Sequence, residues 1–94
     1  MNKYESIIIV NPEVDEAGIK GLEEKFTGLI NENGKVSEVK DLGKKQLAYD
    51  IKKFKEATYV QFDFEAKPEL IAELERVYRI TDDILKFITV KTND

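Results

Sequence analysis

Lysines are the residues of this sequence whose type and spacing best suit them to bind a partner. Residues 35–55 contain seven lysines and three acidic residues, whereas acidic residues outnumber basic ones in the segments on either side. Nucleic-acid binding draws much of its energy from neutralising phosphates, so an anionic partner is expected to meet this basic segment. The pattern leaves open a second interpretation, in which the lysines protect an edge strand against aggregation. The most closely spaced of them are Lys44, Lys45, Lys52, Lys53 and Lys55.

Two adjacent pairs of carboxylates, Glu23-Glu24 and Asp82-Asp83, could form a metal or acid-base site. Adjacent residues on a helix do not face each other, and neither pair is accompanied by a nucleophile. A solvated helix face and a turn are therefore the favoured interpretations. The sequence also contains no cysteine and no histidine, which removes thiolate ligands, imidazole ligands and the usual general base near neutral pH. No cofactor and no metal are expected.

The bulk composition describes an ordinary globular protein. Hydrophobic residues make up 41% and charged residues 36% of the 94 positions, values that match neither a disordered tail nor a membrane protein. The length suits one domain over residues 1–94. The N-terminal apolar run, Ile7 to Val10, is too short for a signal peptide or a membrane span, so a cytosolic location is expected.

The first half of the chain reads as a strand followed by a helix. Residues 4–10 are rich in β-branched side chains and are followed by the turn signal Asn11-Pro12. Asp15 is a plausible N-cap, and apolar residues then recur at helical spacing. The helix is expected to end at Asn33-Gly34, where the glycine would provide a left-handed C-cap.

The second half reads as two strands, a helix and a final strand. Residues 35–42 and 47–51 are expected to be extended segments interrupted at Gly43, and the chain is expected to turn at residues 52–55. Residues 57–64 alternate between apolar and polar, which predicts one buried face formed by Thr58, Val60, Phe62 and Phe64. Pro68 suits the first turn of a helix, and a last strand is expected over residues 85–91.

The resulting order, β-α-β-β-α-β, predicts an α+β fold. Two strand-helix-strand halves fold most simply as a ferredoxin-like sandwich, with a four-stranded antiparallel sheet and both helices on one of its faces. The other face of the sheet is then left for a partner or for solvent.

Two functions known for this fold receive little support. A hydrolase of the acylphosphatase type would hold a phosphate in the loop after the first strand, but three acidic residues between Asn11 and Glu16 would repel an anion. RNA-recognition motifs stack bases on a strand similar to KEATYVQF at residues 55–62, yet Ala57 stands where a second aromatic is usual. A regulatory module that binds a small ligand or dimerises through its open sheet face remains an alternative.

The block LGKKQLAYDI at residues 42–51 resembles the signature of a known protein family, that of bacterial small-subunit ribosomal protein number six. The opening Tyr4-Glu5, the turn Asn11-Pro12, the strand around Tyr59 and the block RITDDILKFITVK at residues 79–91 are also similar. Asp50 departs from the pattern, because the family usually has proline there.

The resemblance implies a non-enzymatic structural component of the small (30S) ribosomal subunit. Such a protein would bind the central domain of 16S ribosomal RNA during assembly, as a heterodimer with the basic ribosomal protein number eighteen, and would be cytoplasmic and ribosome-associated. That pairing would also account for a formal net charge of −4, which disfavours autonomous RNA binding. The resemblance implies no membrane contact and no small-molecule substrate.

The resemblance also suggests which residues would meet the RNA and the partner. Tyr49 and Tyr59 would lie near the RNA or partner surface, although packing is an equal alternative for each of them. The basic residues that match the RNA-facing positions of the family are Lys3, Lys44, Lys45, Arg79, Lys86 and Lys91.

Overall fold

The computed structural model describes residues 1–92, so the last two residues of the expected domain lie outside the described part. Its six elements follow the predicted order. They are β1 (Asn2–Val10), α1 (Glu16–Asn33), β2 (Gly34–Ile51), β3 (Phe54–Ala66), α2 (Pro68–Ile80) and β4 (Ile84–Lys91). Within residues 1–92, no helix is long and apolar enough to cross a membrane.

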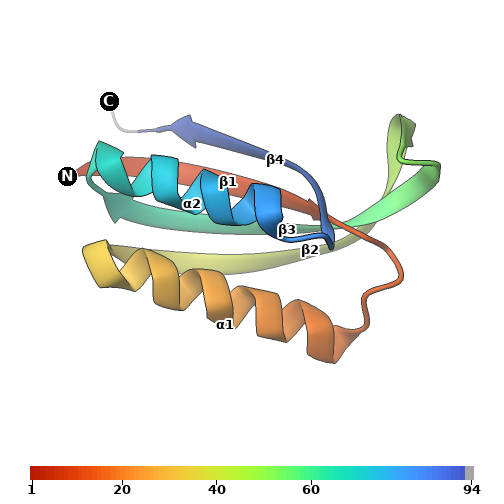
Figure 1. Cartoon of the computed structure of the whole chain (residues 1–94), viewed down its shortest axis with the longest axis horizontal. Coiled ribbons are helices and arrows are strands. Elements are labelled where there is room, and N and C mark those ends of the chain that lie inside the picture. Colours follow the sequence, from red (N-terminus) through yellow and green to blue (C-terminus); the bar gives the residue numbers. More distant parts are fainter. Residues whose placement is uncertain (93–94) are drawn as a thin grey trace.

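The four strands form one sheet in the order β2-β3-β1-β4, and every neighbouring pair is antiparallel. The two helices run along this sheet and bury their apolar sides in a common core with it (Figure 1). The ferredoxin-like prediction is therefore confirmed. Strands β1 and β3 are central, whereas β2 and β4 form the two edges.

The core is built from alternate residues of the central strands. Ile8 pairs with Val60, and Ser6 pairs with Phe62; all four side chains are fully buried on the side that the helices cover. The predicted buried face of β3, from Thr58 to Phe64, is confirmed. Phe26 of α1 and Tyr78 of α2 meet above it, with ring centroids 4.7 Å apart. Both helices therefore depend on this face of the sheet for their packing.

One buried polar cluster connects three elements within this apolar core. The Ser6 hydroxyl of β1 lies 2.8 Å from the Tyr78 hydroxyl of α2 and 3.0 Å from the Thr89 hydroxyl of β4. Burial raises the pKa of Tyr78 far above its usual range, so the phenol remains protonated. Each hydroxyl therefore has a hydrogen-bond partner, as buried polar groups require.

The N-terminal boundary of α1 agrees with the prediction, but the interpretation of its C-terminal glycine was wrong. The Asp15 carboxylate accepts a 2.8 Å hydrogen bond from the backbone N–H of Gly18, as an N-cap does. Gly34, however, has φ −166° and ψ −158°, which is an extended conformation. It pairs with Ala66 as the first residue of β2, and a Cβ at Gly34 would collide with the Glu65 carbonyl oxygen. The glycine is needed for close strand approach rather than for a left-handed turn.

Strand β2 is one long strand and not the two extended segments predicted. Gly43 has φ +75° and lies at a shift of register against β3, so it forms a bulge within the strand. The Asp41 carboxylate accepts a 2.9 Å hydrogen bond from the Gly43 N–H and supports this bulge. The turn is shorter than expected, because only Lys52 and Lys53 separate β2 from β3.

Candidate nucleic-acid interface

Five of the six basic residues predicted to face RNA lie on strands, at two ends of the sheet. Lys3 pairs with Glu65 and Lys91 pairs with Tyr4, near the start of β1. Lys86 pairs with Ile9, near the other end of the same strand. Ile9 lies six positions beyond Lys3 along the extended chain of β1, which corresponds to about 20 Å. The six basic side chains therefore cannot form one compact site.

Lys44 and Lys45, adjacent in the sequence, lie on opposite sides of β2. Lys44 is paired with Thr58, whose side chain belongs to the helix-covered side, and Lys45 is paired with Ala57. Successive side chains of a strand point to opposite faces of its sheet. Both lysines are exposed, but only Lys45 shares the open side with Lys86.

The β2–β3 hairpin curves across the open face of the sheet. Tyr49, near the end of β2, meets Lys86 of β4, although these strands form opposite edges of the sheet. The Lys86 ammonium donates a 3.4 Å hydrogen bond to the Tyr49 hydroxyl and lies 5.9 Å from the centre of its ring. Figure 1 shows the hairpin extending beyond the helices, at the end away from the two termini. At this end, the hairpin thus reaches from one edge strand of the sheet to the other.

The two tyrosines predicted near the partner surface differ in exposure. Tyr49 is 66% exposed, whereas Tyr59 is half-buried beside Ile9 and Gly43, its neighbours across the sheet. Tyr49 therefore offers most of its ring to a partner, in addition to its contact with Lys86. The role of both tyrosines remains a prediction.

Arg79 lies apart from the other predicted residues, in the helical layer. It is exposed near the C-terminal end of α2, where its guanidinium forms a 3.8 Å ion pair with Glu75. The same group lies 5.5 Å from the ring centre of Phe87. Positive charge in the last turn of a helix is favourable by itself, which gives Arg79 a structural role beside the predicted one.

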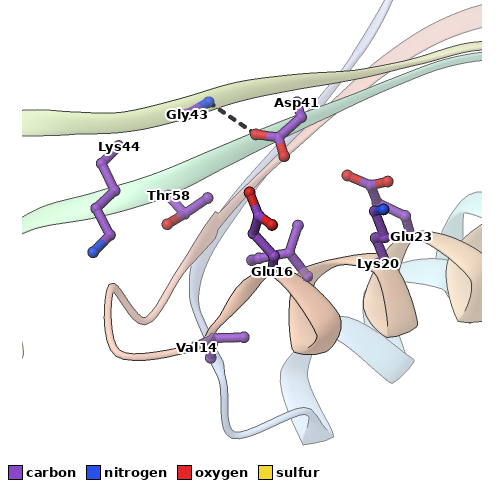
Figure 2. Close-up of a pocket in the computed structure, with 9 residues that line it drawn as sticks. Val14, Glu16, Lys20, Glu23, Asp41, Gly43, Lys44 and Thr58 are labelled. Atoms are coloured by element: carbon purple, nitrogen blue, oxygen red, sulfur yellow. Dashed lines mark hydrogen bonds between the residues drawn. The ribbon is translucent and has the colours of Figure 1, made fainter.

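A cavity of about 440 Å³, which no sequence pattern predicts, lies between β2 and the start of α1. Figure 2 shows Glu16 and Glu23 of α1 facing Asp41 of β2, with Lys20 and Lys44 at its margin. Within residues 1–92, no ion pair of 4 Å or less involves these five groups. These charged residues come from two segments that are far apart in the sequence, so no sequence motif identifies the cavity.

Glu23 is the group in this cavity whose acidity is most affected by its surroundings. Partial burial raises the pKa of its carboxyl, the Asp41 carboxylate raises it further, and Lys20 opposes both effects. In the described part of the chain, no group of acidic residues has the arrangement of a metal site. The excess of carboxylates also makes this cavity unsuited to a phosphate.

The comparisons with known proteins agree along the whole length of the chain. The family model described as ribosomal protein S6 matches residues 3–91. The small ribosomal subunit protein bS6 of Clostridium perfringens is 49% identical over 92 residues, which cover 97% of each chain. The bS6 protein of Heliobacterium modesticaldum is 39% identical over 95 residues, with 100% of this chain and 99% of the relative covered.

Solved structures give the same result. The crystal structure of 30S ribosomal protein S6 from Thermotoga maritima superimposes with a TM-score of 0.90 at 35% identity, over 96% of this chain and 86% of that one. A protein from Arabidopsis thaliana, at 13% identity and a TM-score of 0.56, shares the fold alone. The family-model match and the full-length relatives show that this chain belongs to the ribosomal protein S6 family, whose members are structural components of the small ribosomal subunit.

Proposed function

We propose that this protein, acting as a single domain over residues 1–94, binds the central domain of 16S ribosomal RNA together with ribosomal protein number eighteen and catalyses no reaction. The observation that carries the proposal is the gathering of lysines at the hairpin end of an otherwise acidic molecule. Lys44 and Lys45 lie there on β2, and Lys86 lies on β4 at the same end of the sheet. Lys45 and Lys86 lie on the open side and Lys44 on the helix-covered side, so RNA phosphates would bind around this end of the sheet.

The separation of the basic residues supports an extended contact with RNA. Lys3 and Lys91 would bind the backbone at the far end of the sheet, and Arg79 would bind it at the edge of the helical layer. Contacts spread over about 20 Å along β1 suit the recognition of a folded RNA by its shape rather than by its bases. Tyr49 and Tyr59 would lie at the margin of this surface.

The acidic remainder of the chain supports a shared mode of binding. A formal net charge of −4 repels RNA at a distance, so the lysines act only once the protein is held close to the phosphates. A basic partner protein would hold it there, because opposite charges attract the two proteins to each other and their sum attracts RNA.

The proposal is tested with a variant that carries both Lys44→Ala and Lys45→Ala. Affinity for a central-domain RNA fragment is measured with and without ribosomal protein number eighteen at several salt concentrations. Wild type should bind tightly only with the partner, and the variant should bind about tenfold more weakly. The slope of log affinity against log salt concentration is negative, and its magnitude should decrease by about 1 to 2 in the variant.

A matched control removes the same charge from the helical side. Lys25→Ala with Lys67→Ala deletes two exposed lysines, one in the middle of α1 and one at the start of α2. This control should bind RNA like wild type. An unchanged affinity and salt slope in the Lys44, Lys45 variant would refute the proposed contact.

A further inference from the structure

The turn that joins β2 to β3 has an unfavourable backbone for its residues. Ile51 pairs with Phe54, so Lys52 and Lys53 alone form the loop, with φ of 49° and 72°. Two-residue hairpin loops with positive φ at both positions favour asparagine and glycine, because a Cβ is crowded in this conformation. Among residues 1–92, the remaining position with positive φ is occupied by a glycine, Gly43. The turn geometry therefore does not explain the choice of two lysines.

Neither lysine is used to hold the fold together. Both side chains are exposed. The turn that carries them lies at the tip of the hairpin, which extends beyond the helices in Figure 1. Within residues 1–92, neither ammonium group forms a hydrogen bond or an ion pair. Strained positions that persist without a structural benefit occur most often at functional sites. The two positive charges are therefore what the lysines contribute.

A hollow of about 760 Å³ beside the tip extends this positive charge along the hairpin. Three lysine side chains line it, Lys44 from β2, Lys53 from the turn and Lys55 from β3, together with Glu13 and Glu56. Lysines outnumber acids here, in contrast to the cavity in Figure 2, where Glu16, Glu23 and Asp41 outnumber the lysines. An anion that approaches the hairpin would be drawn to the tip and to this hollow.

We propose that the hairpin tip is a phosphate-binding element, in which Lys52 and Lys53 bind backbone phosphates of RNA and Lys55 with Lys44 binds the adjoining part of the same strand. The inference rests on the proposed function and adds three residues to the contact surface. A lysine ammonium is a compact charge with three donors, which suits a phosphate approached from varied directions.

Two variants separate the charge of the turn from its strain. Lys52→Asn with Lys53→Gly removes both charges and supplies the residues that this backbone favours. Lys52→Gln with Lys53→Gln removes the charges and keeps the strain. The first variant should raise Tm by about 4 to 8 °C, and the second should leave Tm nearly unchanged. Both should bind RNA more weakly by the same factor, because both lack the ammonium groups.

The readout uses small subunits reconstituted with each variant, because membership of the ribosomal family makes wild type a subunit component. We expect either variant to be released from the subunit at a lower salt concentration than wild type. When equal amounts of variant and wild type compete during reconstitution, about tenfold less variant than wild type should be incorporated. The control with Lys25→Ala and Lys67→Ala should behave as wild type. The inference would be overturned if both variants were released at the same salt concentration as wild type and were incorporated equally well in competition with it.

A second measurement identifies the anion. Affinity for 16S ribosomal RNA with ribosomal protein number eighteen, and no other protein, should fall for both variants as it does in the subunit. If only release from the complete subunit changes, the tip contacts an acidic protein and the phosphate assignment fails. If wild type does not bind the central-domain fragment, the proposed function fails, while the subunit measurement still decides the role of the hairpin tip.

Discussion

Glu23 illustrates how a single residue can oppose the stability of its own fold. Its carboxyl is partly buried in the cavity beside Asp41, and both features disfavour its ionised form. The folded protein therefore holds a proton on Glu23 more tightly than the unfolded chain does. A raised carboxyl pKa contributes stability that is complete below the unfolded pKa, near 4.5, and is lost as pH rises through the folded value.

The expected consequence is that Glu23→Gln stabilises the protein at pH 7, by up to about 0.5 kcal/mol, because the site remains close to solvent. The gain should disappear as pH falls below about 4.5, where wild-type Glu23 is also neutral. Urea unfolding at pH 7 and at pH 4 measures both values. Glu24→Gln, at the exposed neighbouring position, provides the control; a gain that persists at pH 4 would exclude the ionic explanation.

At the scale of elements, the glycines of α1 and β2 have different structural effects. Gly34 begins β2 against the backbone of β3, where a Cβ would meet the Glu65 carbonyl oxygen. Gly21 lies in the interior of α1, and a Cβ there would meet nothing within 4 Å. Gly34 therefore allows two strands to approach, whereas Gly21 only adds backbone freedom that folding must remove.

Alanine at these two positions should act in opposite directions. Gly34→Ala is expected to destabilise the protein by about 1 to 3 kcal/mol, because the start of β2 must move away from β3. Gly21→Ala is expected to stabilise it by about 0.5 to 1 kcal/mol through helix propensity. Chemical denaturation of both variants checks the pair. Equal effects at the two positions would show that close approach of β2 does not constrain residue 34.

Across the molecule, the sheet combines a tightly packed centre with a hairpin end whose strand pairing is irregular. The central strands β1 and β3 contribute fully buried residues such as Ile8, Val60 and Phe62, whereas the pairing of β2 with β3 is irregular between Gln46 and Ile51. Family membership places the protein on the small ribosomal subunit in the cytoplasm, as its sequence predicts. The core thus supports a β2–β3 hairpin that extends beyond the helices (Figure 1).

Native-state hydrogen exchange should reproduce this division. Amides of β1 and β3 are expected to exchange only through global unfolding, and those of residues 47–53 at least about 100-fold faster through local opening. Exchange measured residue by residue in the free protein tests the expectation. Protection of the hairpin end equal to that of β1 would mean that the contact between Tyr49 and Lys86 joins it to the core.

Periodicity and capping preferences predicted correctly those features that depend on residues within one helix or strand. The order of the six elements, the Asp15 cap, the start of α2 at Pro68 and the buried face of β3 followed from spacing and residue type. The ribosomal family also followed from blocks in the sequence, and the comparisons confirm it. Periodicity and capping depend on neighbours along the chain, so the sequence contains them directly.

Tertiary structure decided what depends on residues that are distant in the sequence. It placed Gly34 against β3 in an extended conformation, joined two predicted segments into one β2 through the bulge at Gly43, and brought Tyr49 to Lys86. It also separated Lys3 and Lys91 from Lys86 along the sheet. The order of residues along the chain is enough to show which residues are basic and which elements carry them. Only strand pairing determined which of them lie together, because register and curvature arise from contacts between strands and not within them.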